Sequence, residues 1–140
     1  SYGNYNFYEI GEISATGRMT KGVKAIKLGT GETICAATLM KKDISYRGLL
    51  TITTTGKGKI TKIEDFNTTS RAIKGPQVMD LKTETLATVF AVPETQEKIF
   101  ITTNNKAVLL NTDSIPIQNR VTSGVRIIDA RGVESGIEIM

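Results

Sequence analysis

Histidine and tryptophan are absent from this sequence of 140 residues, and cysteine occurs once, at Cys35. Without histidine, the chain cannot build a Ser-His-Asp triad or a histidine-ligated metal site, and it lacks the commonest general base near neutral pH. A single cysteine excludes an internal disulfide and makes a reducing, cytosolic location the default. The apolar run from Ile34 to Leu39 predicts that this thiol is buried and unreactive. We expect no cofactor and no metal.

Long apolar runs and paired carboxylates are also lacking. No stretch of 18 apolar residues occurs, so we expect no membrane-spanning helix and no membrane partner. The carboxylates that could replace histidine as acid–base groups form no pair at catalytic spacing: Glu64, Asp65, Asp80 and Asp129. We therefore expect no catalytic residue in this chain. The net charge of +4 permits a polyanionic partner without requiring one.

What the sequence does contain is an internal repeat. Three segments share an Arg followed four residues later by a Gly: GRMTKGVKAIKL (17–28), SRAIKGPQVMDL (70–81) and NRVTSGVRIIDA (119–130). The arginines are separated by 53 and 49 residues. A second element repeats as well, because LLTITTTGKGKITKI (49–63) matches KIFITTNNKAVLLNT (98–112). A unit of about 50 residues is in the range of propeller blades.

Alternating apolar and polar residues predict that each repeat is built from two β-hairpins. The first hairpin is expected at Leu50–Thr55 and Lys59–Ile63 around a Gly56–Gly58 turn, and at Ile99–Thr103 and Lys106–Leu110 around Asn104-Asn105. The second hairpin is expected at Val23–Leu28 and Thr33–Met40, at Val78–Leu81 and Thr85–Val92, and at Val125–Ala130 and Val133–Met140, with turns at Gly29–Gly31, Lys82–Glu84 and Arg131-Gly132. Tyr5–Ser14 is expected to supply one further strand, and a short helix near Lys41–Tyr46 is the alternative to an all-β chain.

The predicted fold is therefore all-β, with propeller-like repeats of four short strands. The boundaries fall at 1–45 for a partial first blade, 46–95 for the second and 96–140 for the third. A four-stranded unit cannot bury its apolar face alone, so neighbouring units must stack. Three units would leave a ring open. The chain is then either part of a longer ring or one half of a homodimer that completes it.

Two of the repeated motifs resemble a known family. Gly-Arg-x-x-Lys-Gly-Val (17–23) and the hairpin stretch Thr54-Thr55-Gly56-Lys57-Gly58-Lys59 are similar to the repeat of the C-terminal domain of the bacterial gyrase or topoisomerase IV A subunit. The resemblance implies a β-pinwheel, in which neighbouring blades exchange strands. It also implies a non-catalytic role in a bacterial, nucleoid-associated enzyme of the cytoplasm. The partners would be double-stranded DNA, bent around a basic rim, the remainder of the A subunit, and the ATPase subunit.

One motif of that family is incomplete here. Gyrase carries a box, Gln-Arg-Arg-Gly-Gly-Lys-Gly, of which residues 16–22 keep only Arg18 and the final Lys21-Gly22. Two alternatives stay open: a topoisomerase IV-like domain, or the later blades of a gyrase. A further alternative is a propeller-like scaffold for protein partners or self-assembly.

Cations recur at equivalent positions of the repeat, as a phosphate-binding surface requires. The residues expected to bind DNA are Arg18, Lys21, Lys24, Lys57, Lys59, Lys62, Arg71, Lys74, Lys106 and Arg120. The net charge is +2 for residues 1–45, +2 for 46–95 and zero for 96–140, so the first two repeats should make most contacts. For the three repeated arginines a structural role is the alternative, because a guanidinium can also hold neighbouring carbonyls or a carboxylate.

Overall fold

The computed structural model describes residues 2–103, 107–129 and 133–139, and for the last of these ranges only the backbone. The described chain is all-β, as predicted. Its strands are β1 (Tyr46–Thr53), β2 (Lys57–Thr61), β3 (Leu86–Pro93), β4 (Lys98–Thr103), β5 (Ala107–Asn111), β6 (Val125–Arg126) and β7 (Val133–Ile139). Three single 3₁₀ turns accompany them: η1 (Ile10–Glu12), η2 (Ile63–Asp65) and η3 (Thr112–Ser114). No helix among the described residues is long and apolar enough to cross a membrane.

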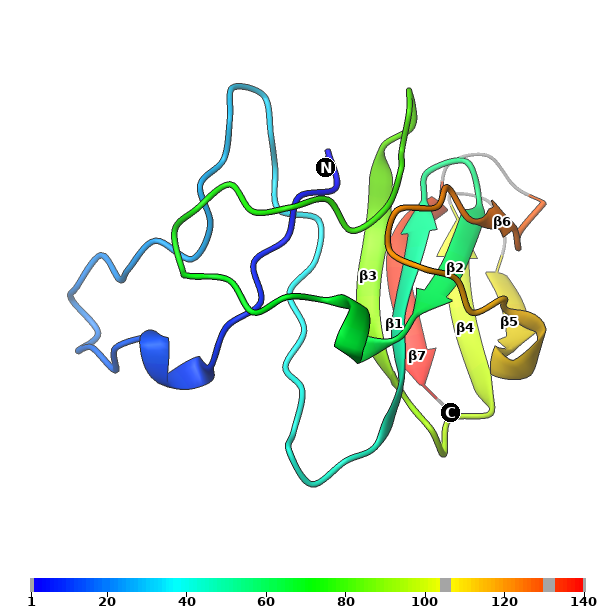
Figure 1. Cartoon of the computed structure of the whole chain (residues 1–140), viewed down its shortest axis with the longest axis horizontal. Coiled ribbons are helices and arrows are strands. Elements are labelled where there is room, and N and C mark those ends of the chain that lie inside the picture. Colours follow the sequence, from blue (N-terminus) through cyan, green and yellow to red (C-terminus); the bar gives the residue numbers. More distant parts are fainter. Residues whose placement is uncertain (1, 104–106, 130–132, 140) are drawn as a thin grey trace.

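The strands form two antiparallel sheets, seen together on one side of the molecule in Figure 1. One sheet has the order β3-β1-β2-β6 and the other has the order β5-β4-β7. In both, the predicted first hairpin is present, with Leu50 opposite Ile60 in one and Ile101 opposite Val108 in the other. The turn of the β1–β2 hairpin comes slightly earlier than expected, because β2 already begins at Lys57. The turn predicted at Asn104-Asn105 lies outside the described residues, as does the turn at Arg131-Gly132.

The four-stranded sheet is completed by a strand from the next repeat. β6 belongs to the third repeat, yet it pairs with β2 of the second, with Lys57 opposite Arg126 and Gly58 opposite Val125. The same contact occurs one repeat earlier, where Asn4 forms a bridge with Gln77. Asn4 and Gln77 precede Lys57 and Arg126 by the repeat distances of 53 and 49 residues. The exchange of strands that the resemblance implied is therefore present. Where each blade begins and ends, at 45/46 and 95/96, stays a prediction.

Two apolar clusters hold these parts together. The larger one combines side chains from both sheets: Leu50, Ile52, Ile60, Phe90, Val92, Ile99, Ile101, Ile115 and Ile128. The smaller one lies on the opposite face of the four-stranded sheet and consists of Phe66, Val78, Met79, Leu81 and Leu86, with Leu49 and Val89 packed against it. Side chains alternate across the pleat, so Leu49 and Leu50 contribute to different clusters. Burying a large apolar side chain stabilises the fold by about 1.5–3 kcal/mol.

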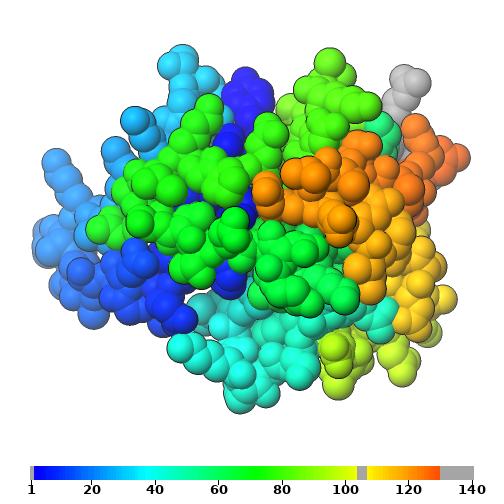
Figure 2. All heavy atoms as spheres, viewed as in Figure 1, coloured from blue at the N-terminus to red at the C-terminus, as the bar shows by residue number. Residues whose placement is uncertain are grey.

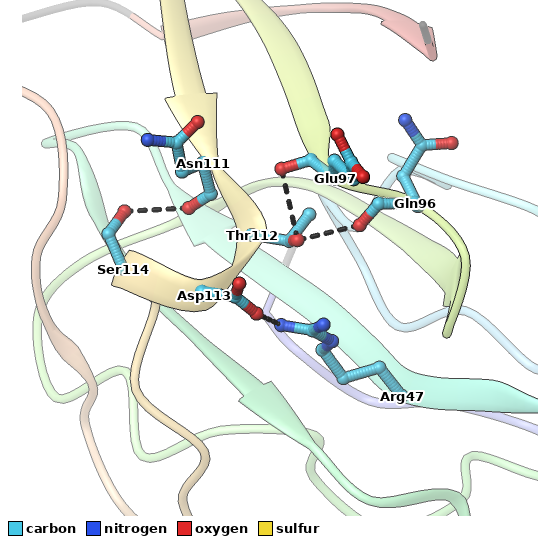
Figure 3. A network of polar contacts seen from close by, with 7 residues as sticks. All are labelled: Arg47, Gln96, Glu97, Asn111, Thr112, Asp113 and Ser114. Carbon is cyan, nitrogen blue, oxygen red and sulfur yellow. Dashed lines mark hydrogen bonds and ion pairs between the residues drawn. The ribbon is translucent and has the colours of Figure 1, made fainter.

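The two sheets are also tied together by polar contacts at η3 (Figure 3). The hydroxyl of Thr112 donates to the carbonyls of Gln96 (2.6 Å) and Glu97 (3.1 Å), so β5 is fixed to the chain that enters β4. The next residue, Asp113, forms an ion pair with Arg47 of β1. Arg47 therefore links the second repeat to the third through this ion pair.

Several predicted strands are not present. The segments Tyr5–Ser14, Val23–Leu28, Thr33–Met40 and Val78–Leu81 form coil, turns or single bridges, and only two of the described residues of Val125–Ala130 are in a strand. These predictions were wrong because alternation gives a segment the capacity to pair but supplies no partner. The chain at 23–28 pairs only at single points, for example Lys27 N–H with the Ile73 carbonyl. The alternative helix near Lys41–Tyr46 is wrong too, since a turn stands there and Tyr46 begins β1.

Candidate nucleic-acid interface

Each of the three repeated Arg-to-Gly segments forms a turn at its arginine. We call residues 17–24 the first loop, 70–77 the second and 119–126 the third. Each contains a glycine with φ +71°, at Gly22, Gly75 and Gly124, a region that residues with a Cβ rarely adopt. At Gly75 a Cβ would stand only 1.9 Å from the carbonyl oxygen of Tyr5. The glycine is thus required by the backbone, and at the second loop also by the close approach of the preceding repeat.

Hydrogen bonds place the loops in a row. Arg71 donates from Nη1 to the Lys24 carbonyl at 2.6 Å, and Arg120 donates from Nη1 to the Gln77 carbonyl at 2.5 Å. In both cases the acceptor stands at the same position of the preceding loop. The structural role that was the alternative for these arginines is therefore observed at Arg71 and Arg120. Figure 2 shows the result, with the second loop (green) between the N-terminal segment (blue) and the third loop (orange) on one face.

Lys59 is fully buried, with 0% exposure, and reaches no solvent. Its ammonium donates to the carbonyls of Asn119 (2.6 Å) and Arg120 (2.7 Å) and to the Thr122 hydroxyl (3.2 Å). Burial, assisted by the charge of Arg120, lowers the pKa of Lys59 from 10.5 to about 8. In this position Lys59 holds the third loop, and it would have to leave these carbonyls to reach a phosphate.

The same position in the first repeat is Asn6, 53 residues earlier. Its amide donates from Nδ2 to the carbonyls of Ala25 (3.2 Å) and Ile73 (3.1 Å). A side-chain donor at this position therefore fixes neighbouring loops in both repeats. Sequence reasoning missed this role because it grouped Lys59 with the other cations of the hairpin turn.

Lys57 forms an ion pair with Glu84 at 2.5 Å. Hydrogen bonding to Lys57 lowers the pKa of the Glu84 carboxyl, although partial burial opposes this. Lys57 is thus partly neutralised within its own repeat. Lys106 lies outside the described residues.

The remaining cations are exposed and unpaired in the described structure: Arg18, Lys21, Lys24, Lys62 and Lys74. Four of them come from the first and second loops, which lie side by side because the Ala72 N–H donates to the Ala25 carbonyl at 3.0 Å. Lys27 is exposed beside them and was not predicted, although it continues the same basic segment. These side chains form what we call the basic row: Arg18, Lys21, Lys24, Lys27 and Lys74.

The third loop differs from the first two in how its cations are placed, and its second arginine, Arg126, pairs with Asp129 at 3.9 Å. Ser123 stands where the first two loops carry Lys21 and Lys74, and Arg120 is committed to the Gln77 carbonyl. A hollow of about 300 Å³ beside it is lined by Arg120 and by the acidic Asp80, among others. The basic row therefore lies on the first two loops.

Comparison with known proteins indicates the family of this chain. A sequence model of the family described as "DNA gyrase C-terminal domain, beta-propeller" matches residues 9–37, 49–93 and 99–133. Over 96% of the chain, the sequence is 31% identical to the A subunit of DNA gyrase from Ureaplasma parvum, of which it covers 16%. Over 91% of the chain it is 29% identical to the A subunit of DNA gyrase from Campylobacter jejuni, of which it covers 15%. The chain thus spans about one sixth of the length of these curated relatives.

Solved structures share the fold. The C-terminal domain of DNA topoisomerase IV superimposes with a TM-score of 0.76 at 22% identity, over 91% of this chain and 40% of that one. The DNA gyrase A C-terminal domain superimposes with a TM-score of 0.69 at 21% identity, over 85% of this chain and 41% of that one. The repeats, the exchanged strand and the matching sequence model agree: this chain belongs to the family of the DNA gyrase C-terminal domain.

Proposed function

We propose that this chain is a non-catalytic, double-stranded-DNA-binding and DNA-bending part of a type IIA topoisomerase A subunit. The observation that carries the proposal is the basic row, in which four exposed cations come from the first two loops and Lys27 follows the first loop. Backbone hydrogen bonds join these two parts of the chain. Lysine and arginine bind duplex DNA chiefly through phosphates, with release of counterions and little reading of sequence. Contact with phosphates along a row of successive loops favours bending, since a bend allows further contacts.

The remaining predicted partners follow from the same proposal. They are the ATPase subunit together with the rest of the A subunit, in a bacterial cytoplasm beside the nucleoid. A homodimer that completes a ring, or a scaffold that binds other proteins, remains the second candidate. It is favoured by the apolar groove of about 1190 Å³ in the first repeat, which is lined by exposed side chains such as Ile34 and Leu39.

The test is a salt titration of binding to a duplex of a few tens of base pairs, with fluorescence transfer between the DNA ends. Lys21→Ser combined with Lys74→Ser gives the first two loops the residue that the third loop already has at Ser123. We expect weaker binding and a salt slope reduced by about 0.9 for each phosphate that is no longer neutralised. We also expect the DNA ends to approach each other on binding, and less so with this variant.

The matched control is Lys41→Ser combined with Lys98→Ser, which removes two exposed cations outside the basic row. This control should bind DNA with nearly the affinity and salt slope of the unchanged chain. Equal losses in both double variants would contradict the basic row, and no binding at low salt would contradict DNA binding by this chain.

A further inference from the structure

The first loop carries a large apolar side chain among its cations. Met19 directly follows Arg18 and is 94% exposed, more than any other large apolar side chain among the described residues. It belongs to neither apolar cluster. Figure 1 shows the first loop (blue) at the end of the molecule away from the two sheets. Exposure alone does not indicate a site, because single apolar side chains are common on protein surfaces.

The position of Met19 is the tip of a closed turn. The Thr20 N–H donates to the Gly17 carbonyl at 3.1 Å, and the Thr20 hydroxyl donates to the same carbonyl at 2.8 Å. Arg18 and Met19 are therefore the two central residues of a four-residue turn. Because the turn is already closed in the free chain, little ordering of its backbone is required when a partner binds the tip.

Exposed cations stand on both sides of this tip. Arg18 precedes Met19 by one residue, Lys21 follows it by two, and both belong to the basic row. Cations of this kind are drawn to the phosphates that border a groove of duplex DNA. An apolar side chain between two phosphate-binding cations then faces the groove and the base pairs beneath it.

The equivalent residues of the other two loops are less suited to reach a base pair. Ala72 of the second loop carries only a methyl group, and its N–H donates to the Ala25 carbonyl at 3.0 Å. Val121 of the third loop is 69% exposed, but it is short and branched and lines the hollow beside Arg120. Of the three loops, only the first therefore combines a long, unbranched apolar tip with exposed cations.

We propose that Met19 is a wedge that inserts between two base pairs from the minor groove and kinks the bound duplex. This inference rests on the proposed DNA binding and adds the means by which the DNA is bent. Apolar wedges, methionine among them, partly unstack one base step while nearby cations hold the backbone. Pyrimidine–purine steps such as TA unstack most easily, so the kink should fall at such a step. Met19 would then decide where the duplex bends, and Arg18 and Lys21 would supply affinity.

The experiment uses the 140-residue chain and a duplex that carries 2-aminopurine beside a single central TA step. Unstacking raises the emission of 2-aminopurine, and we expect a rise of about two-fold when the unchanged chain binds. Fluorescence transfer between the ends of the same duplex reports the bend. Met19→Ala gives the first loop the residue that the second has at Ala72. It should abolish the rise in emission and reduce the bend.

Two further properties of Met19→Ala separate a wedge from other roles. Its salt slope should equal that of the unchanged chain, because Met19 neutralises no phosphate. Its unfolding midpoint should also be unchanged, because the side chain is exposed. Lys21→Ser is the matched variant, which should reduce the salt slope and keep the rise in 2-aminopurine emission once binding is saturated.

A second pair of variants reports insertion from the side of the protein. The chain has no tryptophan, so Met19→Trp and Val121→Trp each introduce a single indole at a loop tip. In the complex, the emission of Met19→Trp should be quenched and protected from acrylamide, because an inserted indole stacks on bases. The emission of Val121→Trp should stay accessible to acrylamide.

Binding with no rise in 2-aminopurine emission would overturn the wedge and leave the proposed DNA binding intact. The same holds for a rise that persists in Met19→Ala, and for indoles that are equally accessible in the two tryptophan variants. A salt slope that falls in Met19→Ala as it does in Lys21→Ser would overturn the wedge as well, since Met19 would then only position the cations. No binding of the unchanged chain at low salt would contradict the proposed function and the wedge together.

Discussion

The first and second repeats have related sequences and different structures. Residues 46–93 of the second repeat include three strands of one sheet, whereas residues 13–45 of the first run as coil and turns (Figure 1). The matched segments 33–40 and 86–93 illustrate the difference, because only the second has β1 beside it. Alternation therefore makes a segment competent to pair, and a neighbouring strand decides whether it does. Three measurements would sharpen this comparison.

The largest effect is expected at the repeated loop glycine. Gly75→Ala should lower the free energy of unfolding by about 3–5 kcal/mol, because it adds left-handed backbone strain to a direct overlap. The added Cβ would stand 1.9 Å from the Tyr5 carbonyl oxygen, and backbone cannot move aside cheaply. Urea denaturation measures the change.

The other loops supply the matched series. At Gly124 the nearest atom to an added Cβ is Met79 Cε at 2.6 Å, the end of a flexible side chain, with the Gly58 carbonyl at 2.9 Å. At Gly22 no atom lies within 4 Å. Gly124→Ala should therefore have an intermediate effect, and Gly22→Ala should show only the strain of about 1–2 kcal/mol. Equal losses of unfolding free energy in the three variants would show that contacts between repeats are not the reason why glycine is required.

The second effect concerns Lys59, whose counterpart Asn6 cannot titrate. The folded state lowers the pKa of Lys59 to about 8, so between about pH 8 and 10.5 the unfolded chain binds more protons than the folded one. The free energy of unfolding should then rise through this window, by about 1.4 kcal/mol for each unit of pKa difference. In Lys59→Met this rise should be absent.

Denaturation of both chains from pH 7 to 11 isolates the contribution of Lys59, because the other titrating groups are common to the two. Parallel pH profiles would contradict a buried, desolvated ammonium at this position. Lys62→Met, which removes an exposed lysine three residues away, should keep the rise.

The smallest effect compares two matched apolar residues. Val92 is fully buried and Leu39, 53 residues earlier, is 67% exposed. Val92→Ala should cost about 2 kcal/mol through lost burial and the cavity left behind. Leu39→Ala should change stability by less than about 0.5 kcal/mol in the chain alone. A large loss at Leu39 would mean that the first repeat is already packed as the second is.

The all-β class, the repeat and the first hairpins could be predicted because they depend on local alternation and turn residues. Strands such as Thr33–Met40 could not be judged, since their formation depends on a partner far away in the sequence. The β2–β6 pairing is of the same kind. Only the resemblance to a strand-exchanging family pointed to it.

The candidate site could likewise be predicted only in part from the sequence. Sequence could show that cations recur, and Lys21 and Lys74 are exposed on the loops where they were expected. It could not show that Lys59 is buried. Lys59 and Thr61 lie on the same face of β2, and the third loop, which is far away in the sequence, covers Lys59 on this face. Arg120 fits the pattern of a phosphate ligand, and sequence could not show that its guanidinium donates to the Gln77 carbonyl.

The pairing of β2 with β6 has a consequence for synthesis on the ribosome. On the side of β2 away from β1, Lys57 and Gly58 pair with Arg126 and Val125, so this part of the edge of the four-stranded sheet stays bare until nearly 70 further residues have been translated. At about 5–20 residues per second, that delay lasts several seconds. Each repeat would thus emerge with an unfinished edge that its successor closes, so an unprotected strand edge would accompany the growing end of the chain throughout its production.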